Sequence, residues 1–226
     1  MREISTDYGA LSTRCDEIDV RKEGKLAQEI VIELKKVVRE KNLKGLSANQ
    51  IGYDKRIMVI NFNGDIRSFI NPIISNAKGI ELSRETCSSI PDKTYIRIRN
   101  NNIEVAYLTP LGKIESRKMF GLAANVFQHH LDHLDGLLLS DVGLEIDEDF
   151  DNATEEERAE VINMYLDALD IRHKEIKEEI ESDEDLKQMS DAIDFIEKMQ
   201  SGEIEVSIEK TPTTPTENKT EDAEQQ

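Results

Sequence analysis

The chain has 226 residues, of which 38% are hydrophobic and 34% are charged, and its formal net charge is -18. This length suits one domain of ordinary size plus an additional segment. The chain lacks a run of eighteen apolar residues, and its first ten residues are acidic and polar where a signal peptide would be basic and then apolar. We therefore expect a soluble protein of the cytoplasm that does not bind membranes.

Negative charge is concentrated in the C-terminal part of the chain. Residues 1–143 carry 21 Lys and Arg against 19 Asp and Glu, a balance of +2, whereas residues 144–226 carry 8 against 28, a balance of -20. We expect a catalytic domain over 1–143, an acidic helical extension over 144–210, and a disordered tail over 211–226 that lacks apolar anchors. An acidic extension repels nucleic acid, so direct nucleic-acid binding is not expected.

The first part of the chain alternates between one helical pattern and several short β-rich runs. Apolar residues recur at helical spacing between Arg21 and Lys41, which predicts an amphipathic helix. The β-rich runs predict strands over 56–60, 68–74, 95–98 and 103–107, separated by turns at 63–65, 100–102 and 110–112. This order predicts an α+β fold with antiparallel sheets.

A second helix is predicted from about Lys118 to Asp135, with Gly136 as its C-terminal stop. His129 and His133 are four residues apart and project from one face of this helix, a spacing that allows two imidazoles to bind one ion. His130 points about 100° away. Such a pair also occurs by chance, and the lone Cys87 can equally be a buried packing residue.

The acidic extension has its own helical signals. Thr154 and Glu157 form a capping box at the start of a helix whose apolar stripe runs over 162–180. A second helix is predicted with apolar residues over 186–196. We expect an acidic helical hairpin that packs on itself or on the catalytic domain. Docking of the extension to a partner is the alternative.

Three segments resemble the signature motifs of the peptide deformylase family, in order. Residues 45–52 read Gly-Leu-Ser-Ala-Asn-Gln-Ile-Gly and resemble Gly-Leu-Ala-Ala-x-Gln-x-Gly. Residues 85–89 read Glu-Thr-Cys-Ser-Ser and resemble Glu-Gly-Cys-Leu-Ser, while residues 128–133 read Gln-His-His-Leu-Asp-His and resemble Gln-His-Glu-x-Asp-His. The resemblance covers roughly residues 5–142. It implies antiparallel sheets packed around the helix that carries the histidines.

The resemblance also implies an activity, which is the removal of the N-formyl group from formyl-methionyl peptides or nascent chains. It assigns one divalent metal ion to Cys87, His129 and His133, and leaves a fourth coordination position for water. Family members work with ferrous iron and accept zinc, so Fe²⁺ is the expected ion and Zn²⁺ the alternative. Substrate contacts are implied for Gly45 and Leu46, and a methionine pocket is expected from the helix around 124–127 and strand residues after Ile90.

Further roles follow from motif positions. The side chain of Gln50 and the backbone N–H of Ser88 are the expected donors to the formyl oxygen as it gains negative charge. Glu85 and Asp132 are expected to hold a ligand histidine or an arginine in place from outside the coordination sphere. For Gln50, Asp132 and Arg97, a surface position is the alternative, and Arg97 would otherwise contact the peptide backbone.

The third motif departs from the family at one catalytic position. His130 stands where the family has the glutamate that takes a proton from water and delivers it to the departing amine. An imidazole can act as a general base, but it reaches differently from a carboxylate; His130 could instead bind the metal or only pack. The alternative function is therefore an impaired relative that binds metal and formyl-peptide without efficient turnover. Thr86 and Leu43 replace motif glycines, and would be strained wherever a positive φ is required.

Overall fold

The computed structural model describes residues 2–182, with side-chain positions for residues 2–169. The chain divides into two units, Met1–Asn163 and Met164–Gln226. The second helix of the predicted hairpin and the predicted tail over 211–226 lie outside the described residues. The predicted boundaries after 143 and 210 stay predictions.

The first unit contains six strands of one antiparallel sheet, with the path β1-β2-β3-β4-β5 and with β6 paired to β4. This confirms the predicted α+β class. The strands are β1 Gly45–Ser47, β2 Ile57–Phe62, β3 Asp65–Cys87, β4 Ile90–Leu108, β5 Ile114–Phe120 and β6 Leu144–Ile146. The helices are α1 Tyr8–Leu11, α2 Val20–Glu40, the 3-10 turn η1 Ala48–Ile51, α3 Leu122–Leu134, α4 Leu139–Val142, α5 Glu148–Asn152 and α6 Glu155–Ser182.

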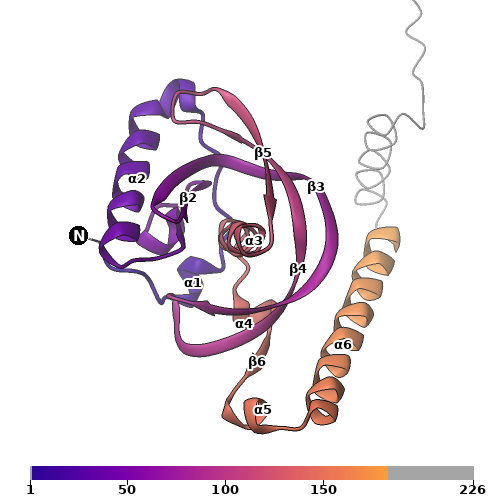
Figure 1. Cartoon of the computed structure of the whole chain (residues 1–226). Coiled ribbons are helices and arrows are strands. Elements are labelled where there is room, and N and C mark those ends of the chain that lie inside the picture. Colours follow the sequence, from indigo (N-terminus) through magenta and orange to yellow (C-terminus); the bar gives the residue numbers. More distant parts are fainter. Residues whose placement is uncertain (1, 183–226) are drawn as a thin grey trace, which may run out of the picture. The chain divides into compact units, whose positions relative to one another are not determined.

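The strands curve around α3, which is seen end-on near the centre of the domain in Figure 1. The apolar face of α3 contributes Ala124, Phe127 and Leu134 to the core, all at 0% exposure. The Phe127 ring meets the Phe69 ring of β3 edge-on, with centroids 5.3 Å apart. Because α3 is held by the sheet on several sides, its polar face is fixed relative to the strand ends.

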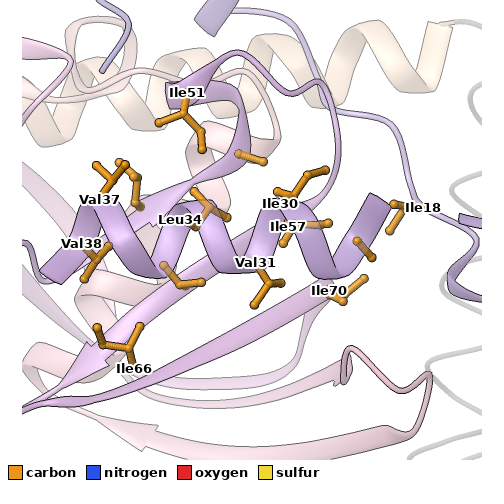
Figure 2. Packing of buried hydrophobic residues seen from close by; sticks show 14 residues of the cluster. Ile18, Ile30, Val31, Leu34, Val37, Val38, Ile51, Ile57, Ile66 and Ile70 are labelled. Carbon is orange, nitrogen blue, oxygen red and sulfur yellow. The ribbon is translucent and has the colours of Figure 1, made fainter. Parts of the chain in front are cut away.

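Helix α2 packs on the face of β2 and β3 opposite to α3. Asp19 caps its N-terminus by accepting from the backbone N–H of Arg21. Figure 2 shows Ile30 and Leu34 of this helix packed towards Ile57 of β2, with Ile70 of β3 nearby. Burying each such side chain contributes about 1.5–3 kcal/mol. The helix predicted between 21 and 41 is confirmed.

Two predictions of local structure were wrong. The predicted helix from 118 begins only at Leu122, because Lys118 and Met119 pair with β4 and Gly121 then adopts a φ of 51°. The predicted turn at 100–102 is continuous strand, since Asn102 pairs with β3 on one side and β5 on the other. Pairing with two neighbours overrides the turn preference of asparagine.

Other local signals are confirmed. Asn63 and Gly64 have φ values of 53° and 100° at the turn between β2 and β3. Gly136 follows α3 with a φ of 75°, and a Cβ there would lie 2.7 Å from the carbonyl oxygen of Ser12. Only glycine fits that position, because both the backbone conformation and the space exclude a side chain.

The start of the acidic extension also has the local structure that its sequence predicts. Thr154 and Glu157 form the predicted capping box, in which Glu157 Oε2 accepts from the Thr154 N–H at 2.8 Å and Thr154 Oγ1 accepts from the Glu157 N–H at 3.2 Å. Helix α6 begins there. Of the described helices, none combines the length and apolar character needed to cross a membrane.

Candidate metal centre and active site

Two elements bring a thiol and two imidazoles together. Cys87 is the last residue of β3, and His129 and His133 project from one side of α3. The ligand atoms of these three residues all lie within 4.8 Å of one another. The Sγ of Cys87 is 3.1 Å from Nε2 of His133. A soft sulfur with two imidazole nitrogens at this separation fits a divalent ion such as Fe²⁺ or Zn²⁺.

Electrostatics also suit a metal at this position. Burial raises the pKa of the Cys87 thiol, but hydrogen bonds from His129 and His133 lower it to about 5. Burial lowers the pKa of His129, and its hydrogen bonds with Cys87 and Glu85 raise it to about 9. The thiol therefore readily becomes the thiolate that binds metals.

Glu85, Arg99 and Asp132 form a charged hydrogen-bond network that orients His129 from outside the candidate metal site. Glu85 Oε2 lies 2.9 Å from His129 Nδ1, so the other ring nitrogen is directed to Cys87. Arg99 donates to both oxygens of Glu85 at 2.7 and 2.9 Å, and to Asp132 Oδ2 at 2.6 Å. Burial raises the pKa of Glu85, but the bonds from Arg99 and His129 lower it to about 2. The carboxylate is therefore ionised and orients the imidazole.

This network brings Glu85 and Asp132 together through a residue that the sequence did not single out. The motifs predict an arginine partner for these carboxylates without identifying which arginine it is. The signal available was the alternation along residues 95–99, which places Tyr95, Arg97 and Arg99 on one face of the strand and does not choose between the two arginines. Arg97 instead donates from Nη1 to the carbonyl oxygen of Val142 at 3.2 Å.

Gln50 is fully buried and its amide orientation is fixed. Its Oε1 accepts from the backbone N–H of Ser47 at 2.9 Å, and its Nε2 donates to Ser89 Oγ at 3.1 Å and lies 4.0 Å from Cys87 Sγ. The amide NH₂ therefore points to the Cys87 side of the site. Ser88 lies in the tight connection from β3 to β4, next to Cys87. The contact with Ser89 was not predicted.

His130 is 6% exposed and belongs to the same group of rings. Its ring stacks on that of His133 with centroids 6.1 Å apart, and its Nδ1 is 3.2 Å from Ser47 Oγ. Burial and the nearby charges of His129 and His133 lower the pKa of His130 well below its usual value. Among the described residues, the group that could hold a metal ion contains Cys87, His129 and His133 and does not include His130.

A cavity of about 630 Å³ opens beside the candidate metal ligands. Cys87, His129 and His130 are among the residues that line it. The other residues that line it are Asn42, Leu43, Lys44, Gly45, Ser83, Arg84, Glu85, Thr86, Ser88, Thr94, Leu122, Asn125 and Val126. Of the implied substrate contacts, Gly45 lies on the cavity, whereas Leu46 is fully buried in the core. Asn125, Val126 and Thr94 come from the segments expected to form the methionine pocket.

The motif departures at Thr86 and Leu43 cause no backbone strain. Over the part of the chain that the structure describes, the non-glycine residues with positive φ are Asn42, Asn63, Asn71 and Asp92. Thr86 is extended and pairs with Thr94 of β4. Neither position needs the freedom of glycine here.

Comparison with known proteins decides the family. Residues 1–147 match the family model described as polypeptide deformylase. The chain belongs to the polypeptide deformylase family. The match spans the sheet, α3 and all of the candidate site residues of this deformylase-family chain.

Curated relatives agree with this membership. The peptide deformylase of Pelagibacter ubique is 42% identical over 103 residues, which cover 43% of this chain and 60% of that protein. The peptide deformylase of Symbiobacterium thermophilum is 36% identical over 120 residues, covering 52% of this chain and 55% of that protein. The chain thus spans less than two thirds of the length of these curated deformylases.

Solved deformylase structures share the fold. The crystal structure of peptide deformylase from Thermotoga maritima aligns with a TM-score of 0.59 at 28% identity, covering 63% of this chain and 97% of that one. A probable peptide deformylase from Synechococcus phage S-SSM7 aligns with a TM-score of 0.58 at 29% identity, covering 63% and 99%. These similarities confirm the predicted deformylase-like fold.

Proposed function

We propose that this protein is a metal-dependent hydrolase that removes the N-formyl group from formyl-methionyl peptides. The observation that carries the proposal is the convergence of Cys87, His129 and His133 within 4.8 Å of one another, with Cys87 and His129 on the wall of a cavity of about 630 Å³. Membership of the deformylase family supports the reaction type. In this reaction water adds to the formyl carbon, the C–N bond breaks, and formate and a free amine leave.

Cys87, His129 and His133 would hold one divalent ion, with Fe²⁺ expected and Zn²⁺ as the alternative. When bound, such an ion supplies Lewis-acid chemistry, which lowers the pKa of water and polarises a carbonyl oxygen. Glu85, itself held by Arg99, keeps the His129 ring turned towards Cys87. Asp132 fixes the other side of the Arg99 guanidinium. These residues keep the ligand geometry in place before the substrate arrives.

The formyl oxygen gains negative charge as water adds, and donors on this chain would stabilise that charge. Gln50 presents its NH₂ group on the Cys87 side because its carbonyl oxygen is held by the Ser47 N–H. The backbone N–H of Ser88 is the second proposed donor. Loss of one such donor typically costs about 2.7–4 kcal/mol in the barrier.

His130 would take the proton from water and return it to the amine as the C–N bond breaks. Its position on the cavity wall, beside both ligand imidazoles, supports this role. Its low pKa keeps the ring neutral near pH 7 and able to accept a proton. Such general acid–base assistance contributes about 10²–10⁴ in rate.

The alternative is an impaired family member that binds metal and formyl-peptide without efficient turnover. The observation that favours it is the tight enclosure of His130, whose ring would lie 2.5 Å from a Cβ at Gly45. A ring so confined has little freedom to follow the proton from water to amine.

Formate release from formyl-Met-Ala-Ser separates the two functions. Protein loaded anaerobically with Fe²⁺ or Zn²⁺ is compared with metal-free protein and with the His130→Ala and His130→Glu variants. We expect release by the loaded wild type and a loss of about 10²-fold or more in His130→Ala. If no formate exceeds the metal-free control while titration calorimetry detects peptide binding, and His130→Glu gains turnover, the impaired relative is the correct function.

The wider context stays a prediction. A cytoplasmic site of action on nascent chains, and proximity to the ribosome, would follow from the proposed substrate. Deleting residues 144–226 and measuring ribosome cosedimentation tests whether the acidic extension takes part. Unchanged cosedimentation would show that the extension does not contribute to ribosome binding.

A further inference from the structure

Ser47 makes two hydrogen bonds to one residue, His130. Its hydroxyl donates to the backbone carbonyl oxygen of His130 at 2.9 Å, and its Oγ lies 3.2 Å from Nδ1 of the same residue. A serine hydroxyl has one proton and otherwise only lone pairs. A carbonyl oxygen can only accept, so both bonds form together only when the hydroxyl proton goes to the carbonyl and the ring supplies the proton of the second bond. The arrangement that satisfies both contacts is the one in which Nδ1 of His130 carries a hydrogen.

This fixes which ring nitrogen can take part in proton transfer. With Nδ1 protonated, Nε2 is the only ring atom of His130 with a free lone pair. The Nε2 and Cδ2 atoms lie against Gly45, where a Cβ would approach both within 2.5 Å, and both residues line the cavity. Because Gly45 has no side chain, the Nε2 edge of the His130 ring can lie at the cavity wall.

Ser47 also acts on a second residue of the site. Its backbone N–H donates to Gln50 Oε1 at 2.9 Å, which turns the Gln50 NH₂ group to the Cys87 side. One buried residue of β1, at 0% exposure, thus orients two side chains of the proposed machinery. Only the bonds to His130 depend on the side chain of residue 47.

We propose that Ser47 is a positioning residue that holds His130 in the Nδ1-protonated tautomer, and that the serine and the histidine are a matched pair. The first family motif has alanine at the position of Ser47, and the third has glutamate at the position of His130. A carboxylate offers equivalent oxygens and needs no tautomer selection. An imidazole has two tautomers, and one of them presents a hydrogen where an acceptor is needed.

Nuclear magnetic resonance of the imidazole nitrogens tests the tautomer directly. Full-length protein labelled with ¹⁵N-histidine and loaded with Zn²⁺ is examined by long-range ¹H–¹⁵N correlation, and His130→Gln assigns the signals. We expect a protonated Nδ1 and an unprotonated Nε2 for His130 in the wild type. In Ser47→Ala the tautomer should shift towards protonated Nε2, because Nδ1 loses its acceptor. Ser75→Ala is the matched control, since the Ser75 hydroxyl donates to the Glu104 carbonyl oxygen at an exposed site.

A kinetic cycle tests the pairing, and this part depends on the proposed hydrolysis. Ser47→Ala should lower kcat by about tenfold with His130 present, and change it less than about twofold in the His130→Glu background. KM for formyl-Met-Ala-Ser should be nearly unchanged. A purely structural role of Ser47 would lower both backgrounds equally.

The outcomes are distinguishable. An unchanged His130 tautomer in Ser47→Ala, or equal loss of kcat in both backgrounds, overturns the pairing. If no variant releases formate but the tautomer shifts in Ser47→Ala, the positioning role holds and the proposed hydrolysis fails. Thermal unfolding of each variant, followed by circular dichroism, verifies that the comparison is made on folded protein.

Discussion

Sγ of Cys87 lies 3.1 Å from Nε2 of His133, although the two residues are 46 positions apart in the chain. The contact joins the end of β3 to the last turn of α3. Had the thiol been out of coordinating range of the paired imidazoles, the enzymatic interpretation of the motifs would fail. The geometry instead makes the metal centre open to direct test.

Removal of a proposed ligand should abolish metal binding. Purified wild-type protein is expected to bind about one equivalent of Zn²⁺, whereas Cys87→Ala and His133→Ala should bind close to none, because two remaining side-chain ligands hold a divalent ion weakly. Inductively coupled plasma mass spectrometry after dialysis measures the number of Zn²⁺ ions bound per protein. Cys15→Ala is the control for loss of a buried thiol elsewhere, and it should retain the ion. Full retention by Cys87→Ala would contradict the assignment.

Breaking the buried ion network should destabilise the domain. Arg99 has 3% side-chain exposure and bridges the buried Glu85 and the partly exposed Asp132, so Arg99→Met removes the bidentate partner of Glu85 and leaves it only the bond to His129. We expect a loss of about 3–5 kcal/mol in the free energy of unfolding, measured with urea. Arg84→Met is the matched control. Arg84 and Asp151 pair at 2.7 Å with exposures of 55% and 44%, so solvent screens the pair and this change should cost much less than Arg99→Met. Equal losses of unfolding free energy in the two variants would show that the Arg99 network stabilises the domain no more than an exposed ion pair does.

The two cysteines should differ in reactivity when the metal is removed. Burial, with the nearby Asp54, raises the pKa of Cys15 to about 12, whereas Cys87 has a pKa of about 5. Iodoacetamide at pH 7 should therefore modify Cys87, which lines the cavity, and leave Cys15 unmodified in the folded protein. Peptide mass spectrometry identifies the site.

The pH dependence of this alkylation has a definite sign. Because the Cys87 thiol is already deprotonated above about pH 5, its rate should change little between pH 6 and pH 8. An ordinary thiol with a pKa of about 8.5 would react roughly tenfold faster per pH unit over that range. Added Zn²⁺ should protect Cys87. A rate that rises steeply with pH would argue against the hydrogen bonds from the two histidines.

The cavity wall should influence substrate affinity through Asn125. Its Nδ2 donates to Glu81 Oε1 at 2.6 Å and to Ser83 Oγ at 3.2 Å, which makes this part of the wall polar. If the methionine side chain packs here, Asn125→Leu should lower KM for formyl-Met-Ala-Ser about threefold to fivefold through added apolar contact. Asn76→Leu, on a separate small polar cavity, is the control. A raised KM would place the methionine side chain elsewhere.

Local features of this protein followed from its sequence. The amphipathic period over 21–41, the capping box at Thr154, and the left-handed stop at Gly136 were predictable, because each depends on residues within a few positions of one another. The motif residues also indicated the Cys87, His129 and His133 group. Their resemblance to a family carried that inference, since spacing alone left Cys87 as an ordinary buried residue.

Tertiary structure decided what depended on distant pairing. Asn100–Asn102 became strand rather than turn because β3 and β5 both pair with that segment, and Lys118–Phe120 became strand because β4 was available beside it. The choice of Arg99 over Arg97, and the contact of Ser47 with His130 across 83 positions, likewise required the sheet to curve around α3. Sequence determines which groups a chain carries and its local turns. Only the packed fold determines which of those groups share a buried site, because that depends on how distant strands and helices pack together.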